Sequence, residues 1–246
     1  MPAEPAPPAP VLLLFDIDGT LVQGATRSHR DALHQALRQV HGIDAERFGL
    51  SASPAGRTDG DIARSILLDA GVSAERVDAR ADAVREACCR AYVDLCEPDL
   101  SDRAVPGMPE LLSWLTDQAS VRLALVTGNY EAVARLKLRR AGIGHWFPTG
   151  QGAFGSDAED RSALPPIARR RAGSRGRPHP QKATVVIGDT PRDIACAQAD
   201  SLRCIGVTSG PFAAEELIQA DAVASDVGQL RETLAELISR GPVSCR

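Results

Sequence analysis

The chain has very little lysine. Only Lys137 and Lys182 among its 28 basic residues are lysines, and the rest are arginines. Any reaction that needs a lysine therefore has two candidates. The basic residues form no long one-sided run, and the net charge is −4. This balance argues against nucleic acid as a partner, because binding to phosphate backbones needs a surplus of cations.

Long apolar runs and CxxC pairs are also absent. No segment approaches the roughly 18 apolar residues of a membrane span, so we expect no membrane partner. Residues 1–10 hold five prolines and no basic residue, unlike a secretory signal. We expect a disordered tail there, or alternatively a polyproline ligand for an aromatic groove. The six cysteines are then expected to be reduced thiols of a cytoplasmic protein.

Short apolar runs of the kind found in strands buried on both faces recur along the chain. They span residues 11–15, 121–126, 184–187 and 203–207. The last three each precede a helical stretch, at 131–141, 193–199 and 213–220. Strands that alternate with helices indicate an α/β fold, a doubly wound, Rossmann-like parallel sheet. A further strand is expected near 148–154 and a surface helix over 227–239.

A different pattern fills residues 23–104, which contain no strand-like run. Apolar spacing predicts three helices here, the second opening at Thr58. We expect an all-helical domain inserted into a core made of residues 11–22 and 105–246, where it can act as a lid. His29 and His34 are assigned to the surface of this lid, and Cys88 and Cys89 to its packing.

Acidic residues directly follow two of the predicted strands. Asp16 and Asp18 come after 11–15, and Asp189 and Asp193 come after 184–187. The carboxyl ends of parallel strands form the ligand crevice of such a sheet, so these carboxylates are expected to converge. They would repel one another unless a cation lies among them. Oxygen ligands alone favour a hard ion, and Mg²⁺ is the expected cofactor.

A possible phosphate site follows the second core strand. Thr127, Gly128 and Asn129 close that strand and precede a helix. A hydroxyl together with free backbone N–H groups at a helix N-terminus suits a phosphate. Combined with the acids and a divalent metal, this arrangement predicts phosphoryl transfer on a small phosphate ester.

These motifs carry a family resemblance. The order DxDGTL at 16–21, a strand ending in Thr127, and GDxxxD at 188–193 resembles the haloacid dehalogenase (HAD) superfamily. The helical insertion resembles the C1 cap of its phosphoglycolate phosphatase-like branch, and the resemblance covers residues 11–240. It implies a Mg²⁺-dependent phosphatase for a small phosphorylated metabolite such as phosphoglycolate, acting as a monomer or homodimer.

The resemblance also implies residue roles. Asp16 would be the nucleophile that forms an aspartyl phosphate, and one of its oxygens would bind the metal. Asp18 would act first as general acid and then as general base, with its backbone carbonyl on the metal. The remaining roles are metal binding by Asp189 and Asp193 and phosphoryl binding by Thr127, Gly128 and Asn129.

The family also uses a cation on the phosphate, usually a lysine before a helix that precedes the GD motif. Lys182 lies ahead of its strand, about 20 Å from the carboxyl end. Lys137 lies about two turns into a helix that is expected to lead away from the site. Arg161, 28 residues before Asp189, has the right spacing. We assign Arg161 as the phosphate clamp, the alternative being a solvated helix arginine.

Two further arginine segments have open interpretations. The run Gly56-Arg57-Thr58 resembles the cap loop that reaches into the active site in this branch. Arg57 and Thr58 are therefore candidate substrate contacts, with an exposed loop arginine as the alternative. The arginine-rich segment 169–177 is interpreted as a solvated loop, with a site for an anionic partner as the alternative.

Single residues help to distinguish a phosphatase from other activities of the superfamily. A sugar phosphomutase of the β-phosphoglucomutase type shares nearly all these motifs and stays open as the enzymatic alternative. A phosphonatase needs a lid lysine, and residues 22–104 contain none. A dehalogenase lacks the second acid, whereas Asp18 is present. The non-enzymatic alternative is a regulatory module in which phosphorylation of Asp16 serves as a switch.

Overall fold

The computed structural model describes residues 9–48 and 53–240. Most of the tail expected at residues 1–10 lies outside these ranges. Within them, no helix is both long enough and apolar enough to cross a membrane.

A single sheet of six parallel strands forms the centre of the core, in the order β3-β2-β1-β4-β5-β6. The strands are β1 (Val11–Phe15), β2 (Val121–Thr127), β3 (Ala153–Phe154), β4 (Thr184–Gly188), β5 (Arg203–Val207) and β6 (Ala222–Ala224). The order runs outward from β1 in one direction and then from β4 in the other. This confirms the predicted doubly wound α/β fold and places the ligand crevice where the direction changes, at the ends of β1 and β4.

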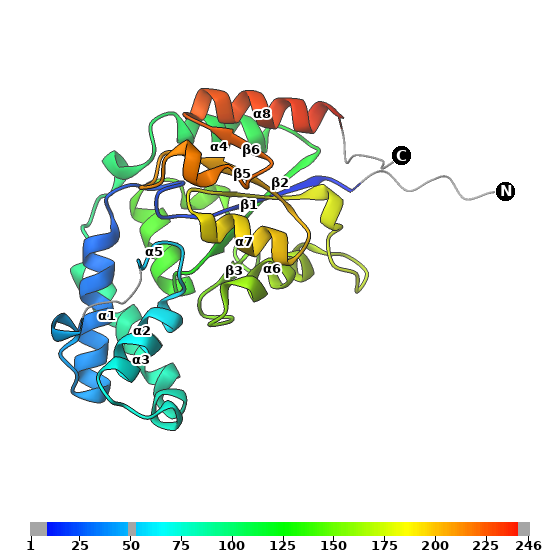
Figure 1. Ribbon diagram of the computed structural model, residues 1–246. Coiled ribbons are helices and arrows are strands. Elements are labelled where there is room, and N and C mark those ends of the chain that lie inside the picture. Colours follow the sequence, from blue (N-terminus) through cyan, green and yellow to red (C-terminus); the bar gives the residue numbers. More distant parts are fainter. Residues whose placement is uncertain (1–8, 49–52, 241–246) are drawn as a thin grey trace.

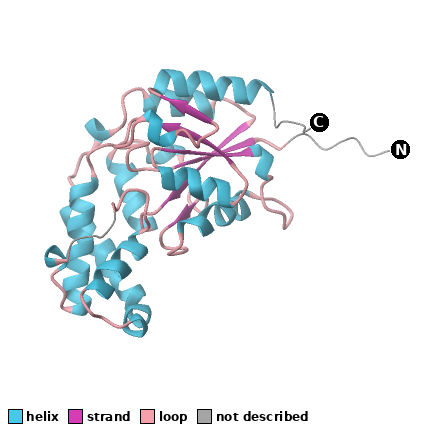
Figure 2. Cartoon of the chain, viewed as in Figure 1, coloured by secondary structure: helices cyan, strands magenta, loops and turns pink. Residues whose placement is uncertain are grey.

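Helices cover both faces of the sheet (Figure 2). Along β1, Leu13 and Phe15 pack into one apolar core, and Leu12 and Leu14 pack into the other. This alternation follows from the strand geometry, in which successive side chains point to opposite faces. The first core also takes residues of α4 (Met108–Thr116), α5 (Glu131–Arg140) and α8 (Val227–Arg240), and the second takes residues of α6 (Leu164–Ala172) and α7 (Pro191–Ala199).

Some elements differ from the predictions. The sequence interpretation missed α4 and β6 altogether. Arg161, which was assigned from its spacing to Asp189, lies in a 3₁₀ turn, Arg161–Ala163. The α-helix starts at Leu164 because the following prolines fit only its first turn. The helix predicted over 213–220 is reduced to a short 3₁₀ turn, Ala214–Leu217.

Three helices, α1 (Thr26–His41), α2 (Asp59–Asp69) and α3 (Ala74–Leu95), form a separate layer beyond the carboxyl ends of the strands (Figure 1). We call this layer the helical unit. The chain enters it past Val22 and leaves it past Ala104, and these two residues form an antiparallel bridge. This bridge joins the two connections to the helical unit and keeps the unit next to the crevice.

Candidate active site

Three aspartates meet at the carboxyl ends of β1 and β4. Asp16 follows β1 directly, and its N–H donates to the Ile187 carbonyl at 2.9 Å. Asp189 follows β4, and Asp193 lies in the first turn of α7. One carboxylate oxygen from each of the three lies within 4.8 Å of the other two, and all three residues are buried. Parallel pairing of the two central strands therefore brings together carboxylates that are far apart in sequence.

A guanidinium lies within this cluster. Arg161 Nη2 is 3.1 Å from Asp16 Oδ1 and also pairs with Asp193 Oδ1. Its side chain is only 8% exposed, so the alternative of a solvated helix arginine does not hold. Three carboxylates and one guanidinium leave a formal charge of −2 in a buried space. That charge suits one divalent cation.

Burial and the neighbouring carboxylates both affect the pKa values of the cluster. Burial raises the pKa of Asp16 to about 7; the Arg161 guanidinium opposes this shift, and the Asp193 and Asp18 carboxylates reinforce it. Burial, followed by repulsion from Asp16 and Asp193, raises the pKa of Asp189 to about 8. Without a further cation, the carboxylates can share the space only by retaining protons.

One oxygen of the cluster is left without a partner. Asp189 Oδ1 accepts from the Thr20 hydroxyl at 3.1 Å, but Asp189 Oδ2 is buried and accepts no hydrogen bond. A Cβ atom added at either Gly19 or Gly210 would overlap Oδ2, so glycine backbone surrounds this oxygen closely. A buried unpaired acceptor is costly, and a bound cation would remove that cost. The residues present therefore fit a divalent metal.

The carboxylate of Asp18 lies outside this cluster and is paired with Lys137. Lys137 Nζ is 2.6 Å from Asp18 Oδ1, 2.8 Å from Oδ2 and 2.9 Å from Asn129 Oδ1. The prediction that Lys137 leads away from the site was wrong. Side chains on a helix point back toward its N-terminus, and the long lysine stem covers the distance that the helix has advanced. The ammonium group is fully buried.

This pairing sets the charge of Asp18. Burial is the largest single influence and raises the pKa of Asp18, but the charge of Lys137, the nearby His29 and the hydrogen bonds from Lys137 and Asn129 together outweigh it, so that the net pKa lies below its ordinary value. Asn129 adds to this by donating from Nδ2 to Asp18 Oδ2 at 2.9 Å and to Thr127 Oγ1 at 3.1 Å. In this arrangement Asp18 is a charged carboxylate held in one orientation.

The turn that carries Thr127, Gly128 and Asn129 is enclosed on two sides. A Cβ atom added at Gly128 would overlap the Arg57 carbonyl, and one added at Gly155 would overlap the Gly128 carbonyl. Both positions therefore require glycine. The turn is held between the helical unit and the segment that follows β3.

The loop before α2 lies against the core. The side chain of Arg57 is 11% exposed and bonds Asp61 at 2.6 and 2.9 Å, so it is not the exposed loop arginine of the alternative interpretation. The Thr58 hydroxyl donates to the Glu159 carbonyl at 2.6 Å and accepts from the Asp61 N–H at 3.1 Å. Thr58 thus caps α2 and docks it on the core. Its hydroxyl has no free hydrogen to donate to a substrate.

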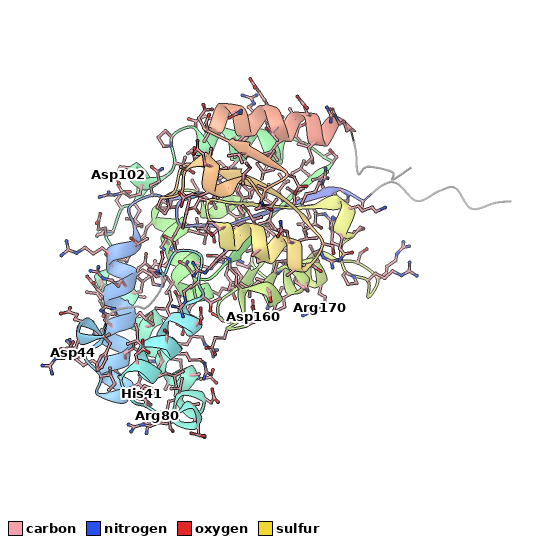
Figure 3. The ribbon with its side chains drawn as sticks, in the orientation of Figure 1. His41, Asp44, Arg80, Asp102, Asp160 and Arg170 are labelled. Atoms are coloured by element: carbon pink, nitrogen blue, oxygen red, sulfur yellow. The ribbon has the colours of Figure 1, made fainter. Side chains whose placement is uncertain are left out.

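A cavity of about 560 Å³ opens beside this loop. Arg57 lines it from the helical unit, and residues 160–162 and Arg192 line it from the core. Figure 3 shows Asp160 nearer the helical unit than Arg170, in keeping with a cavity at the seam between the two layers. Arg161 lines the cavity and also contacts Asp16, so the seam leads to the carboxylate cluster.

The segment 169–177 is only partly the solvated loop that was predicted. Arg169 bonds both oxygens of Asp200, and Arg171 bonds both oxygens of Asp157. These two arginines tie α6 to neighbouring segments. Arg170 is exposed, as expected for a solvated position.

Sequence reasoning also missed polar groups of the helical unit. His29 was assigned to the surface, but its side chain is 11% exposed, and its Nε2 lies 3.0 Å from Asp59 Oδ2. The signal was present in the helix period, because His29 precedes the buried Leu33 by four residues and so shares its face. Asp59 itself is 3% exposed and was not singled out.

Comparisons with known proteins agree with this geometry. The phosphoglycolate phosphatase of Pseudomonas putida is 27% identical over 205 residues, which cover 82% of this chain and 70% of that protein. The "Probable phosphatase IndB" of Dickeya dadantii is 28% identical and spans 95% of this chain and 98% of its own. The crystal structure of a hydrolase from Pseudomonas syringae superimposes with a TM-score of 0.64 at 23% identity, covering 92% of this chain and 99% of that one.

The strongest statement comes from a family model. The model described as haloacid dehalogenase-like hydrolase matches residues 13–198, which include all three strand-end motifs of the site. The chain belongs to the haloacid dehalogenase-like hydrolase family.

Proposed function

We propose that the chain is a Mg²⁺-dependent phosphatase that hydrolyses a small phosphorylated metabolite through an aspartyl phosphate on Asp16. One observation carries this proposal. A buried strand-end carboxylate, Asp16, is in contact with a guanidinium and belongs to a three-aspartate group of metal-binding geometry. A nucleophile, an anion-binding cation and ligands for a hard metal thus meet at one point. The relatives named as phosphoglycolate phosphatases support phosphoglycolate or a similar ester as substrate.

In the first step, a carboxylate oxygen of Asp16 attacks phosphorus, and the bond between phosphorus and the leaving oxygen breaks. Asp18 is charged in the free chain, but the negative charge of a bound phosphate ester favours its protonation, and Asp18 then gives this proton to the leaving oxygen. Arg161 binds phosphoryl oxygens through its guanidinium, which suits that geometry. Thr127, with the N–H groups of Gly128 and Asn129, binds the others.

In the second step, Asp18 takes a proton from water, and the resulting hydroxide attacks phosphorus. The bond to Asp16 breaks, and inorganic phosphate leaves. Lys137 favours this step, because its ammonium group stabilises the charged form of Asp18 that a general base needs.

The side chains of Asp16, Asp189 and Asp193 would hold Mg²⁺, with the backbone carbonyl of Asp18 as a further ligand. When bound, the ion neutralises charge on the transferring phosphoryl group. Because Asp189 Oδ2 has no other partner, it is available to the metal.

Residues 23–104 act in this proposal as a cap that excludes water around the intermediate. The cavity at the seam accommodates the part of the substrate that does not react, and Arg57 contacts it. Three arginines and three acidic residues line this cavity, so it suits a polar substrate.

The test is phosphate release from an aryl phosphate and from a panel that includes 2-phosphoglycolate, with and without Mg²⁺. The proposal expects release by the wild type and none by Asp16→Asn. The proposal would be overturned if the wild type released phosphate from no ester of the panel and Asp16→Asn gave the same rates as the wild type. The mutase alternative is distinguished in the same assay, because a mutase returns the phosphoryl group from Asp16 to a hydroxyl of a sugar phosphate and releases no inorganic phosphate.

A further inference from the structure

A buried carboxylate of the helical unit contacts the phosphate-binding turn. Asp59 is the first residue of α2, and its side chain is 5% exposed. Its Oδ2 accepts a hydrogen bond from the Tyr130 N–H at 2.7 Å. Its own N–H donates to the Gly128 carbonyl at 2.9 Å. One residue of the helical unit therefore bonds the core backbone on both sides of Asn129.

The segment that Asp59 bonds carries three groups of the proposed reaction. Thr127 and Gly128 belong to the phosphate site, and Asn129 Nδ2 donates to Asp18 Oδ2 at 2.9 Å. A small shift of this backbone would therefore move the phosphate ligands and the support of Asp18 together. The opposite side of the turn is fixed, because the Gly155 N–H donates to the Asn129 carbonyl at 2.9 Å.

The position of Asp59 is itself supported. His29 Nε2 of α1 lies 3.0 Å from Asp59 Oδ2. The His29 ring packs edge-on against Tyr92 of α3, with ring centroids 5.6 Å apart. All three helices of the helical unit thus contribute to one chain of contacts that ends at the turn. Tyr130 is the N-cap residue of α5, and its side chain makes no capping hydrogen bond. The negative charge of Asp59 therefore also stabilises the positive N-terminal end of α5.

We propose that Asp59 is a positioning residue, which holds the 127–130 turn in its reactive geometry from the helical unit. The helical unit then does more than cover the site: when it is docked, it completes the shape of the phosphate-binding turn. This inference rests on the proposed phosphatase function.

Three variants of the full chain test it. Asp59→Ala removes the acceptor of the Tyr130 N–H. Asp59→Asn keeps an oxygen acceptor of the same shape and is the conservative rescue. Asp69→Ala removes an exposed carboxylate at the other end of α2 and is the matched control. Each is measured for kcat and KM on an aryl phosphate with Mg²⁺, and for hydrogen exchange of the peptide that contains residues 127–130.

The expected result is a fall in kcat of about 30-fold for Asp59→Ala, the equivalent of one hydrogen bond to a charged acceptor. KM should stay within about threefold, because the turn remains in the site and still binds the substrate phosphate. Its exact position matters most in the transition state, where charge develops on the phosphoryl group. Asp59→Asn should keep kcat within about fivefold of wild type, because only the charge is lost. Exchange should rise at 127–130 in Asp59→Ala alone.

Two results overturn the inference. In one, Asp59→Ala keeps wild-type kcat and wild-type exchange at 127–130. In the other, exchange rises uniformly through the helical unit while kcat of the folded fraction is unchanged, which assigns Asp59 a structural role. The exchange measurement needs no turnover. If the wild type hydrolyses no ester, the proposed function fails while the exchange data still decide whether Asp59 holds the turn.

Discussion

Lys137 Nζ lies 2.6 Å from Asp18 Oδ1, across 119 positions of sequence. The lysine is fully buried, and the side chain of Asp18 is 22% exposed. A buried ammonium without a charged partner is costly, so Lys137 requires Asp18. The pair joins α5 to the loop after β1 and fixes the second aspartate of the motif.

Lys137→Met is expected to lower both stability and turnover. Removing one partner of a buried ion pair costs about 3 kcal/mol, at the low end of the usual range because Asp18 keeps some solvent. Turnover on an aryl phosphate should fall about 100-fold, because Asp18 loses its orientation. Thermal unfolding and steady-state kinetics measure the two effects.

The other lysine of the chain supplies the control. Lys182→Met changes an exposed residue just before β4, at the end of the strand away from the site. It should leave stability and turnover at wild-type values. The double variant Lys137→Met/Asp18→Asn should regain most of the lost stability without regaining activity. A Lys137→Met chain with wild-type stability and kcat would show that the pair has no such role.

Arg161→Ala is expected to lower kcat/KM by about 100- to 1000-fold, the usual effect of losing one charge-stabilising group from an active site. Arg161→Lys should recover part of this loss, since it restores the charge but not the two-pronged geometry. Arg170→Ala, an exposed arginine on α6, is the control. Equal kcat/KM for Arg161→Ala and Arg170→Ala would contradict the assigned role.

Metal binding should depend on pH in a defined direction. The pKa values of Asp16 and Asp189 are raised from 3.8 to about 7 and about 8. Between the ordinary and raised values, the folded metal-free chain binds more protons than the unfolded chain, so its stability falls as pH rises through this window. Mg²⁺ must displace those protons.

The increase in Tm on adding Mg²⁺ should therefore be larger at about pH 8.5 than at about pH 6. Asp189→Asn should remove most of this increase at both values, because it takes away a metal-binding carboxylate. Thermal scans with and without Mg²⁺ measure it. An increase that is larger at the lower pH, or is unchanged in Asp189→Asn, would exclude the three-aspartate group as the metal site.

Arg57→Ala should raise KM for the natural substrate by about tenfold, while KM for a small aryl phosphate stays within about twofold. The reason is that Arg57 lines the seam cavity and not the carboxylate cluster. Arg38→Ala, a more exposed arginine of α1, is the control. An equal change of KM on every ester would indicate that Arg57 only holds the loop in place.

The parallel sheet and the aspartates at its edge could be predicted because both depend on local sequence. Apolar runs mark strands, and the carboxyl ends of parallel strands meet by topology, so Asp16 and Asp189 were placed together. Arg161 was found from the cation that the family resemblance implies and from its spacing to Asp189, and the structure places it in contact with Asp16.

Lys137, His29 and Asp59 could not be placed in the same way. Each depends on where a side chain points after two or more elements have packed. Counting residues along α5 gives the position of the Lys137 backbone, whereas the direction of its stem decides that its ammonium reaches Asp18. The contact between Asp59 and the Gly128 turn exists only when α2 is docked on the core, and no local pattern encodes that docking.

The central claim is covalent catalysis by Asp16, and rapid acid quenching during turnover tests it most directly. Peptide mapping of the quenched wild-type chain should find a phosphoryl group on the peptide that contains Asp16, and none in Asp16→Asn. Phosphate release by the wild type without any such adduct, together with an active Asp16→Asn variant, would contradict the account.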